Sequence, residues 1–279
     1  MSKSLNISRN LFASVNYNES ILISNYQKLC EKIAVFPKSF AVVTDFDFTL
    51  TKYRMSTKSF STISMMRSLL APEYTAQVEA LFNHYYPIEI NFSLEKSIRR
   101  AHMEEWWERE YNIISKANIN HSDLLNIIES TSIALRAGVK ETFELCKSKN
   151  IPISVLSAGI GNLVEIMLAP ILHENVRIKS NFLIMEDTGK FAGFKKPLIH
   201  SGNKADAVND LEFEAALVIG DMPSDVAAVP PKAKHTIFIG FLNDNSLYKL
   251  EDFTNNFDIV VLNDGNFDVV KDLVKQLTN

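Results

Sequence analysis

The stretch VVTDFDFTLT, residues 42–51, decides how the fold is interpreted. It begins inside an apolar run, Ser39–Thr44, which is typical of a short buried strand. Two carboxylates, Asp45 and Asp47, follow directly after this predicted strand. In open α/β sheets, ligands bind beyond the carboxyl ends of the strands. The stretch therefore predicts a site that both carboxylates serve, although a polar loop with incidental acids has the same pattern.

A second apolar run, Ala215–Ile219, ends in a similar way. Gly220 allows a sharp turn after it, and Asp221 and Asp225 follow. Carboxylates gathered at the ends of different strands form an oxygen-rich site, which suits Mg²⁺ better than zinc. The alternative is that both aspartates form turns or cap a helix.

The segment IPISVLSAGIG, residues 151–161, predicts a strand that ends in small residues, Ser157, Ala158 and Gly159, before a helix. Small residues let backbone N–H groups approach an anion, and a helix N-terminus adds positive partial charge. The segment also resembles the start of a GxGxxG fingerprint, but residue 164 is valine where the third glycine belongs. We therefore do not expect a dinucleotide site, and the lack of a GxxxxGK[ST] loop excludes a P-loop NTPase.

Lys204 follows the stretch FKKPLIHSGN and precedes a short helical pattern. A lysine near the edge of the sheet could neutralise a phosphate. Taken alone, such a lysine is more often a solvated surface charge. It is a candidate here because three other segments predict a site at the same edge.

The alternation of apolar runs and helical patterns predicts an α/β fold with a parallel sheet covered on both faces. Residues 58–136 differ, because they contain several helical patterns and no convincing strand. About 110 residues separate Asp47 from Ser157, far more than a strand–helix–strand crossover needs. We therefore expect a Rossmann-like core of residues 1–57 and 137–279, with a helical cap domain, 58–136, inserted after the first strand. Further elements are predicted as strands at Ile151–Leu156, Thr236–Ile239 and Asp258–Leu262, helices at Gly161–Leu168 and Asn266–Leu277, and a hairpin near Met185–Gly193.

Composition limits the classes of function. The 279 residues are 46% hydrophobic and 22% charged, as in an ordinary globular protein. A net charge of -4 lacks the basic footprint of a nucleic-acid binder but allows a small anionic substrate. Two cysteines are too few for a disulfide framework, and no apolar run reaches the roughly 18 residues of a membrane span. We expect a soluble cytoplasmic protein, a monomer, without nucleic-acid or membrane partners.

Four segments, DFDFTL, SAG, a following lysine and GDMPSD, resemble in this order the motifs of the haloacid dehalogenase superfamily of phosphotransferases. The segments HYYPIEI, HMEEWWE, SAGIGN, NKAD and IGFLND resemble the cytosolic 5'-nucleotidase III family, also called pyrimidine 5'-nucleotidase. The similarity runs over most of residues 40–275. The double tryptophan of HMEEWWE is similar to the 7-methylguanosine phosphate-specific branch of that family.

The resemblance implies a role for each matching residue. Asp45 is expected to be the nucleophile and a metal ligand. Asp47 is expected to be the general acid/base, with its backbone carbonyl on Mg²⁺. Lys204 is expected to neutralise the nucleophile and the phosphate. The other implied roles are phosphate binding by Ser157 and Ala158, Mg²⁺ binding by Asp221, an outer-shell place for Asp225, and contact with the base by Glu89 and Trp107.

The resemblance predicts a Mg²⁺-dependent 5'-nucleotidase that acts through an aspartyl-phosphate intermediate. Its substrates would be CMP and UMP, 7-methylguanosine monophosphate, or both. Adjacent helix positions point about 100° apart, so of Trp106 and Trp107 we expect one to pack in the cap and Trp107 to line the pocket. The alternatives are a sugar-phosphate phosphatase or nucleoside phosphotransferase on the same core, and a catalytically silent nucleotide-binding protein.

Three departures from the family pattern stand out. The stretch DVAAVPPKAKH is more proline-rich, and only about 17 residues separate Lys204 from Asp221. Glu110 stands where a pyrimidine-specific member would have a small hydroxyl residue. The first two departures affect loops, whereas Glu110 leaves the preferred base open.

Overall fold

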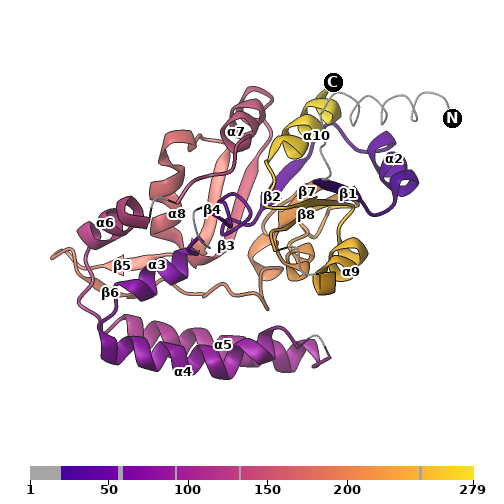
Figure 1. The fold of residues 1–279 in the computed structure, drawn as a ribbon. Helices are drawn as coiled ribbons and strands as arrows, with labels where there is room; N and C mark the ends of the chain where they lie inside the picture. The colour runs from indigo at the N-terminus through magenta and orange to yellow at the C-terminus, as the bar shows by residue number, and fades with distance from the viewer. Residues whose placement is uncertain (1–19, 56–58, 92, 132, 245–246) are drawn as a thin grey trace.

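The computed structural model describes residues 20–55, 59–91, 93–131, 133–244 and 247–279 (Figure 1). Its centre is a seven-stranded sheet in the order β1-β9-β8-β7-β2-β3-β4. The pair β1–β9 is antiparallel, and all other neighbours in this sheet are parallel. The strands are β1 (Ile21–Ile23), β2 (Ala41–Thr44), β3 (Ile153–Ile160), β4 (Val176–Asn181), β7 (Ala215–Gly220), β8 (His235–Leu242) and β9 (Ile259–Leu262). The predicted α/β fold with a mostly parallel sheet is confirmed.

Helices cover both faces of this sheet, because the side chains of each strand alternate between the faces. In β7, Leu217 and Ile219 join a large hydrophobic cluster that includes residues of α7 and α10. Ala216 and Val218 join a smaller cluster on the other face, together with Val208 of η2. The covering helices are α2 (Tyr26–Ala34), α7 (Val139–Ser148), α8 (Gly161–Leu168), α9 (Leu247–Asn256) and α10 (Asp268–Thr278), with short 3-10 helices η1 (Ala169–Ile171), η2 (Asp206–Val208) and η3 (Pro223–Ala227).

In the described residues between β2 and β3, four helices precede α7, as the helical patterns predict: α3 (Thr62–Ser68), α4 (Pro72–Glu89), α5 (Lys96–Ile114) and α6 (His121–Thr131). Figure 1 shows α4 and α5 side by side, away from the sheet. Residues of all four helices form a separate hydrophobic cluster with a hairpin, β5 (Leu183–Met185) and β6 (Phe191–Phe194). The division into a core and a cap of residues 58–136 stays a prediction, and its boundary residue Lys58 lies outside the described residues.

The predicted strands differ from the observed ones in two respects. The strands β1 and β4 are absent from the sequence predictions, because β1 has only three residues and β4 is not an apolar run. The strands predicted to end at Leu156 and at Ile239 continue to Ile160 and to Leu242, and β3 shifts its register against β4 on the way. In the part of the chain that the structure describes, no helix is long and apolar enough to cross a membrane.

Arg136 holds the turn that follows Asp47. Phe48 in this turn has φ 63°, in the left-handed region that costs a non-glycine residue about 1–3 kcal/mol. Arg136 is 2% exposed and donates hydrogen bonds to the carbonyls of Phe48 (2.6 Å) and Thr49 (2.9 Å). Its other partners are the Gly265 carbonyl, the Asn243 side-chain oxygen and the Asp264 carboxylate. One buried cation therefore joins the turn after β2 to the loops after β8 and β9.

Replacing Arg136 tests how much this buried cation contributes to the stability of the fold. Arg136→Ala is expected to lower the free energy of unfolding by about 3–5 kcal/mol, because it removes the counter-charge of the half-buried Asp264 carboxylate and the guanidinium that donates to the Thr49 and Gly265 carbonyls. Chemical denaturation measures the change. Arg177→Ala, on the exposed side of the edge strand β4, is the matched control and should change stability little. An equal, small loss for both variants would contradict the role given to Arg136.

Candidate active site

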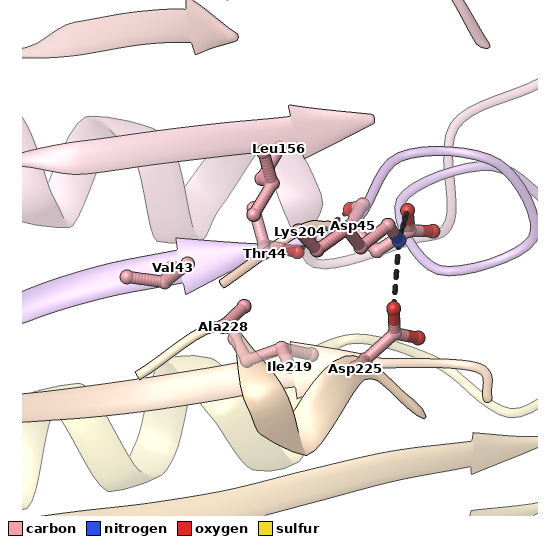
Figure 2. A pocket seen from close by; sticks show the side chains of 8 residues that line it. All are labelled: Val43, Thr44, Asp45, Leu156, Lys204, Ile219, Asp225 and Ala228. Carbon is pink, nitrogen blue, oxygen red and sulfur yellow. Dashed lines mark hydrogen bonds and ion pairs between the residues drawn. The ribbon is translucent and has the colours of Figure 1, made fainter. Parts of the chain in front are cut away.

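Side chains from three distant segments meet at the carboxyl end of the sheet (Figure 2). Asp45 follows β2, Asp225 lies in η3 after β7, and Lys204 lies in the loop before η2. The Lys204 Nζ donates to Asp45 Oδ1 at 2.6 Å and to Asp225 Oδ1 at 2.7 Å. All three residues are buried. The adjacent parallel strands β2 and β7 thus bring the two predicted carboxylate segments together, and the lysine is not a solvated surface charge.

The site holds more carboxylates than cations. Burial raises the pKa of Asp45 to about 6, with Lys204 lowering it and Asp225 raising it. Burial, and then the charges of Asp45 and Asp225, raise the pKa of Asp221 well above its usual range. Burial acts to lower the pKa of Lys204, but Asp225 and Asp45 outweigh it, so this pKa is raised. Lys204 therefore stays charged, and the excess of negative charge favours a further cation.

The donor atoms at this edge fit a hard divalent cation. The expected set is the side chains of Asp45 and Asp221 with the backbone carbonyl of Asp47, which are all oxygens of the kind that Mg²⁺ prefers. The charge of Asp45 is the largest one acting on Asp221. Across the described ranges, no three His, Cys, Asp or Glu side chains form a candidate metal cluster. The expected set does not require one, because its third donor is a backbone carbonyl.

Asp47 is bonded to the first helix of the insert. Its Oδ1 accepts a hydrogen bond from the Thr62 backbone N–H at 2.8 Å, and its Oδ2 accepts one from Thr62 Oγ1 at 2.7 Å. Burial raises the pKa of Asp47 to about 7, against the hydrogen bonds from Thr62 and together with the charge of Asp45. A carboxyl group with a pKa near neutral is suited to proton transfer.

Ser157 and Ala158 lie in the last part of β3, next to Gly159. The Ser157 hydroxyl is buried and accepts the Gly159 N–H at 3.0 Å. A Cβ at Gly159 would lie 1.8 Å from Thr62 Oγ1 and 2.6 Å from Asp47 Oδ2, so only glycine fits there. The phosphate-binding roles of Ser157 and Ala158 stay predictions.

Glu89 links the insert to the loop that carries Lys204. Its Oε1 accepts a hydrogen bond from Ser201 Oγ at 2.6 Å. Burial raises the pKa of Glu89, and the Ser201 hydrogen bond and the Lys204 charge act to lower it. Glu89 therefore lies close enough to Lys204 for their charges to interact. A carboxylate expected to contact the base of a substrate would lie near the lysine expected to bind its phosphate. Its contact with a base stays a prediction.

Both tryptophans are buried. Trp106 is 3% exposed and Trp107 7%, and their rings stack with centroids 5.7 Å apart. The two rings stack although adjacent helix positions point about 100° apart, and the expected division into one packed and one pocket-lining ring stays a prediction. Each indole N–H lacks a hydrogen-bond partner within the described residues. The contact of Trp107 with a base stays a prediction.

Glu110 is fully buried and forms two hydrogen bonds, both 2.7 Å, with the guanidinium of Arg67 in α3. The residue that departs from the family pattern is thus neutralised by a cation of the same insert. The sequence analysis missed three residues that bond to predicted site residues or to Glu110: Thr62, Arg67 and Ser201. None of them belongs to a motif, and each meets a partner far away in the sequence.

Comparisons with known proteins identify the family of this chain. The model of the family described as pyrimidine 5'-nucleotidase (UMPH-1) matches residues 48–278. The human 7-methylguanosine phosphate-specific 5'-nucleotidase is 30% identical over 251 residues, covering 85% of this chain and 84% of its own. The protein of the same name from Drosophila melanogaster is 33% identical over 257 residues, covering 85% and 80%.

Solved structures show the same fold. The crystal structure of cytosolic 5'-nucleotidase IIIB bound to cytidine superposes with a TM-score of 0.84 and 28% identity, and 96% of each chain is covered. A phosphoserine phosphatase, solved as an analogue of its phospho-aspartyl intermediate, has a TM-score of 0.54 at 15% identity, covering 83% of this chain and 97% of its own. The predicted haloacid dehalogenase-like fold is confirmed.

The buried carboxyl of Asp47 predicts a pH dependence of stability. In metal-free buffer with EDTA, Asp47→Asn should gain stability relative to wild type as the pH rises from 5 to 8. The folded-state pKa of about 7 lies above the ordinary 3.8, so wild-type stability falls as the pH rises through the folded-state value, and asparagine does not titrate. At about 1.4 kcal/mol per pKa unit, the difference in Tm should grow by several degrees.

The matched control for this measurement is Asp187→Asn, at an exposed carboxylate in the turn between β5 and β6. Its Tm difference from wild type should stay flat over the same pH range. A flat difference for Asp47→Asn as well would show that this carboxyl is not buried as described.

Proposed function

This chain belongs to the pyrimidine 5'-nucleotidase (UMPH-1) family, and from that premise we propose that it hydrolyses nucleoside 5'-monophosphates to nucleoside and phosphate. One observation carries the proposal. The Lys204 ammonium contacts the carboxylate of Asp45, 2.6 Å away, at the edge of the sheet where Asp47 also lies. A carboxylate nucleophile, a cation and a carboxyl group of near-neutral pKa are suited to phosphoryl transfer through a covalent intermediate.

The proposed reaction has two steps. A carboxylate oxygen of Asp45 attacks phosphorus, and the bond from phosphorus to the 5'-oxygen breaks. Asp47 gives its proton to that oxygen, because an alkoxide is a poor leaving group. Asp47 then takes a proton from water, whose oxygen attacks the aspartyl-phosphate and releases phosphate. Lys204 offsets the repulsion between the carboxylate of Asp45 and the substrate phosphate throughout.

Asp45, Asp221 and the Asp47 carbonyl are proposed to hold Mg²⁺. When bound, this ion would add positive charge against the phosphoryl oxygens. Asp225 is proposed to act from the outer shell by holding Lys204, which it contacts at 2.7 Å. Ser157 and Ala158 are proposed to bind the phosphate.

The base is proposed to contact Glu89 and Trp107 in the insert. A carboxylate and an indole suit a flat base that carries N–H donors or positive charge, as 7-methylguanine does. The names of the similar proteins support 7-methylguanosine monophosphate, and the cytidine-bound structure supports a pyrimidine nucleotide. We propose both as substrates. A cytoplasmic location is also a proposal, supported by the word cytosolic in the names of similar proteins.

Asp45→Asn tests the reaction. Phosphate release from CMP, UMP, 7-methylguanosine monophosphate and a set of sugar phosphates should be measured with Mg²⁺ and with EDTA. Wild type should release phosphate from nucleotides with Mg²⁺ only, and Asp45→Asn should lose about 10⁴-fold or more, because it lacks the nucleophile. Asp187→Asn should keep wild-type rates. Near-normal release by Asp45→Asn, or a preference for sugar phosphates, would overturn the proposal.

Trp107→Tyr tests the contact with the base. A smaller ring weakens stacking and cation–π attraction, so the ratio of 7-methylguanosine to pyrimidine kcat/KM should fall about threefold or more. Trp106→Tyr, at the neighbouring buried ring, is the control and should leave the ratio unchanged. If the two variants have equal ratios, Trp107 does not read the base.

A further inference from the structure

Thr62 connects three parts of the site, and the proposed reaction gives it no role. Its backbone N–H and its hydroxyl donate to the two carboxylate oxygens of Asp47, at 2.8 Å and 2.7 Å. Its hydroxyl oxygen also accepts the backbone N–H of Ile160 at 3.1 Å. Thr62 begins α3 of the insert, whereas Ile160 ends β3 of the core. One residue of the insert therefore joins Asp47 to the central sheet.

We infer that Thr62 is a positioning residue, which aims the carboxyl of Asp47 at the leaving oxygen of the substrate. The inference rests on the proposed function, in which Asp47 is the general acid. Each carboxylate oxygen has two lone-pair directions, and Thr62 uses one direction on each oxygen. A second direction on each oxygen remains for the proton. That proton leaves Asp47 for the 5'-oxygen as its bond to phosphorus breaks, and both Thr62 donors then stabilise the new carboxylate.

The contacts leave Thr62 little freedom. Its single hydroxyl proton is committed to Asp47, and a lone pair is committed to Ile160, so the hydroxyl cannot rotate without losing a bond. Gly159 lies directly beside the same oxygen, since a Cβ added there would lie 1.8 Å from Thr62 Oγ1. Errors of about 1 Å in the position of a reacting group can cost about 10²-fold in rate. The Asp47 carboxyl is therefore held in its position only while α3 packs against β3 (Figure 1).

The test compares two leaving groups. A nucleoside 5'-monophosphate needs a proton on its leaving oxygen, whereas p-nitrophenyl phosphate releases a stable phenolate that does not. Thr62→Val removes the hydroxyl and keeps the shape of the side chain. Its kcat/KM, which reports formation of the aspartyl-phosphate and not the later hydrolysis step that both substrates share, should fall about 10–100-fold on the nucleotide and less than about threefold on p-nitrophenyl phosphate. Thr62→Ser, which keeps both donors, should restore the wild-type ratio of the two rates.

Two controls accompany these variants. Asp47→Asn removes the acid itself and should show the same selectivity for leaving group, with a larger loss on the nucleotide. Thr75→Val removes a hydroxyl that, among the described residues, bonds to the Leu70 and Ala71 carbonyls at the start of its own helix, so it should leave both rates unchanged. Both substrates are measured on one sample, so the ratio of rates does not depend on how much of a variant is folded.

Each outcome decides the matter. If Thr62→Val loses activity equally on both substrates, or on neither, the positioning role of Thr62 is overturned. In that case the nucleotidase activity of the wild type still supports the proposed function. A failure of Thr62→Ser to restore the ratio would also overturn the role. If wild type itself releases no phosphate from any nucleotide, the proposed function fails, and the inference fails with it.

Discussion

The contact of one buried ammonium with two carboxylates is the interaction on which the rest of the site depends. Lys204 lies within 2.7 Å of both Asp45 and Asp225. Removing three charged groups from water costs several kcal/mol for each ion, and the mutual attraction offsets this only with good geometry. The sheet supplies that geometry, because β2 and β7 are adjacent and parallel and place the two acidic segments at one edge.

The backbone around these carboxylates is correspondingly restricted. Phe48 adopts a left-handed conformation, and the guanidinium of Arg136 holds its carbonyl. A Cβ on Gly220 would lie 2.2 Å from Asp225 Oδ2, just as one on Gly159 would overlap Thr62. Glycine therefore occurs where the chain passes directly beside a carboxylate. These close approaches let acids from separate loops share a small volume.

The insert takes part in the chemistry of the core through specific bonds. Thr62 bonds to Asp47, Glu89 accepts a hydrogen bond from Ser201, and Arg100 pairs with Asp206 at 2.7 Å. The last two bonds join α4 to the loop that carries Lys204 and α5 to η2, which directly follows that loop. The part of the molecule proposed to read the base is thus bonded to the part proposed to bind the phosphate, so a change of position in one affects the other.

The amino-acid sequence by itself determined the α/β class, the helices of the insert and the two acidic strand ends, because apolar runs, helical periods and the residues after a strand are local patterns. The structure shows Lys204 in contact with Asp45, which the resemblance led us to expect, and also with Asp225, which it did not specify. The tertiary structure alone decided the contacts of Thr62 and Arg136, the length of β3 and the stacking of the two tryptophans. Such contacts join residues far apart in the chain, and local periodicity carries no information about which distant surfaces pack together.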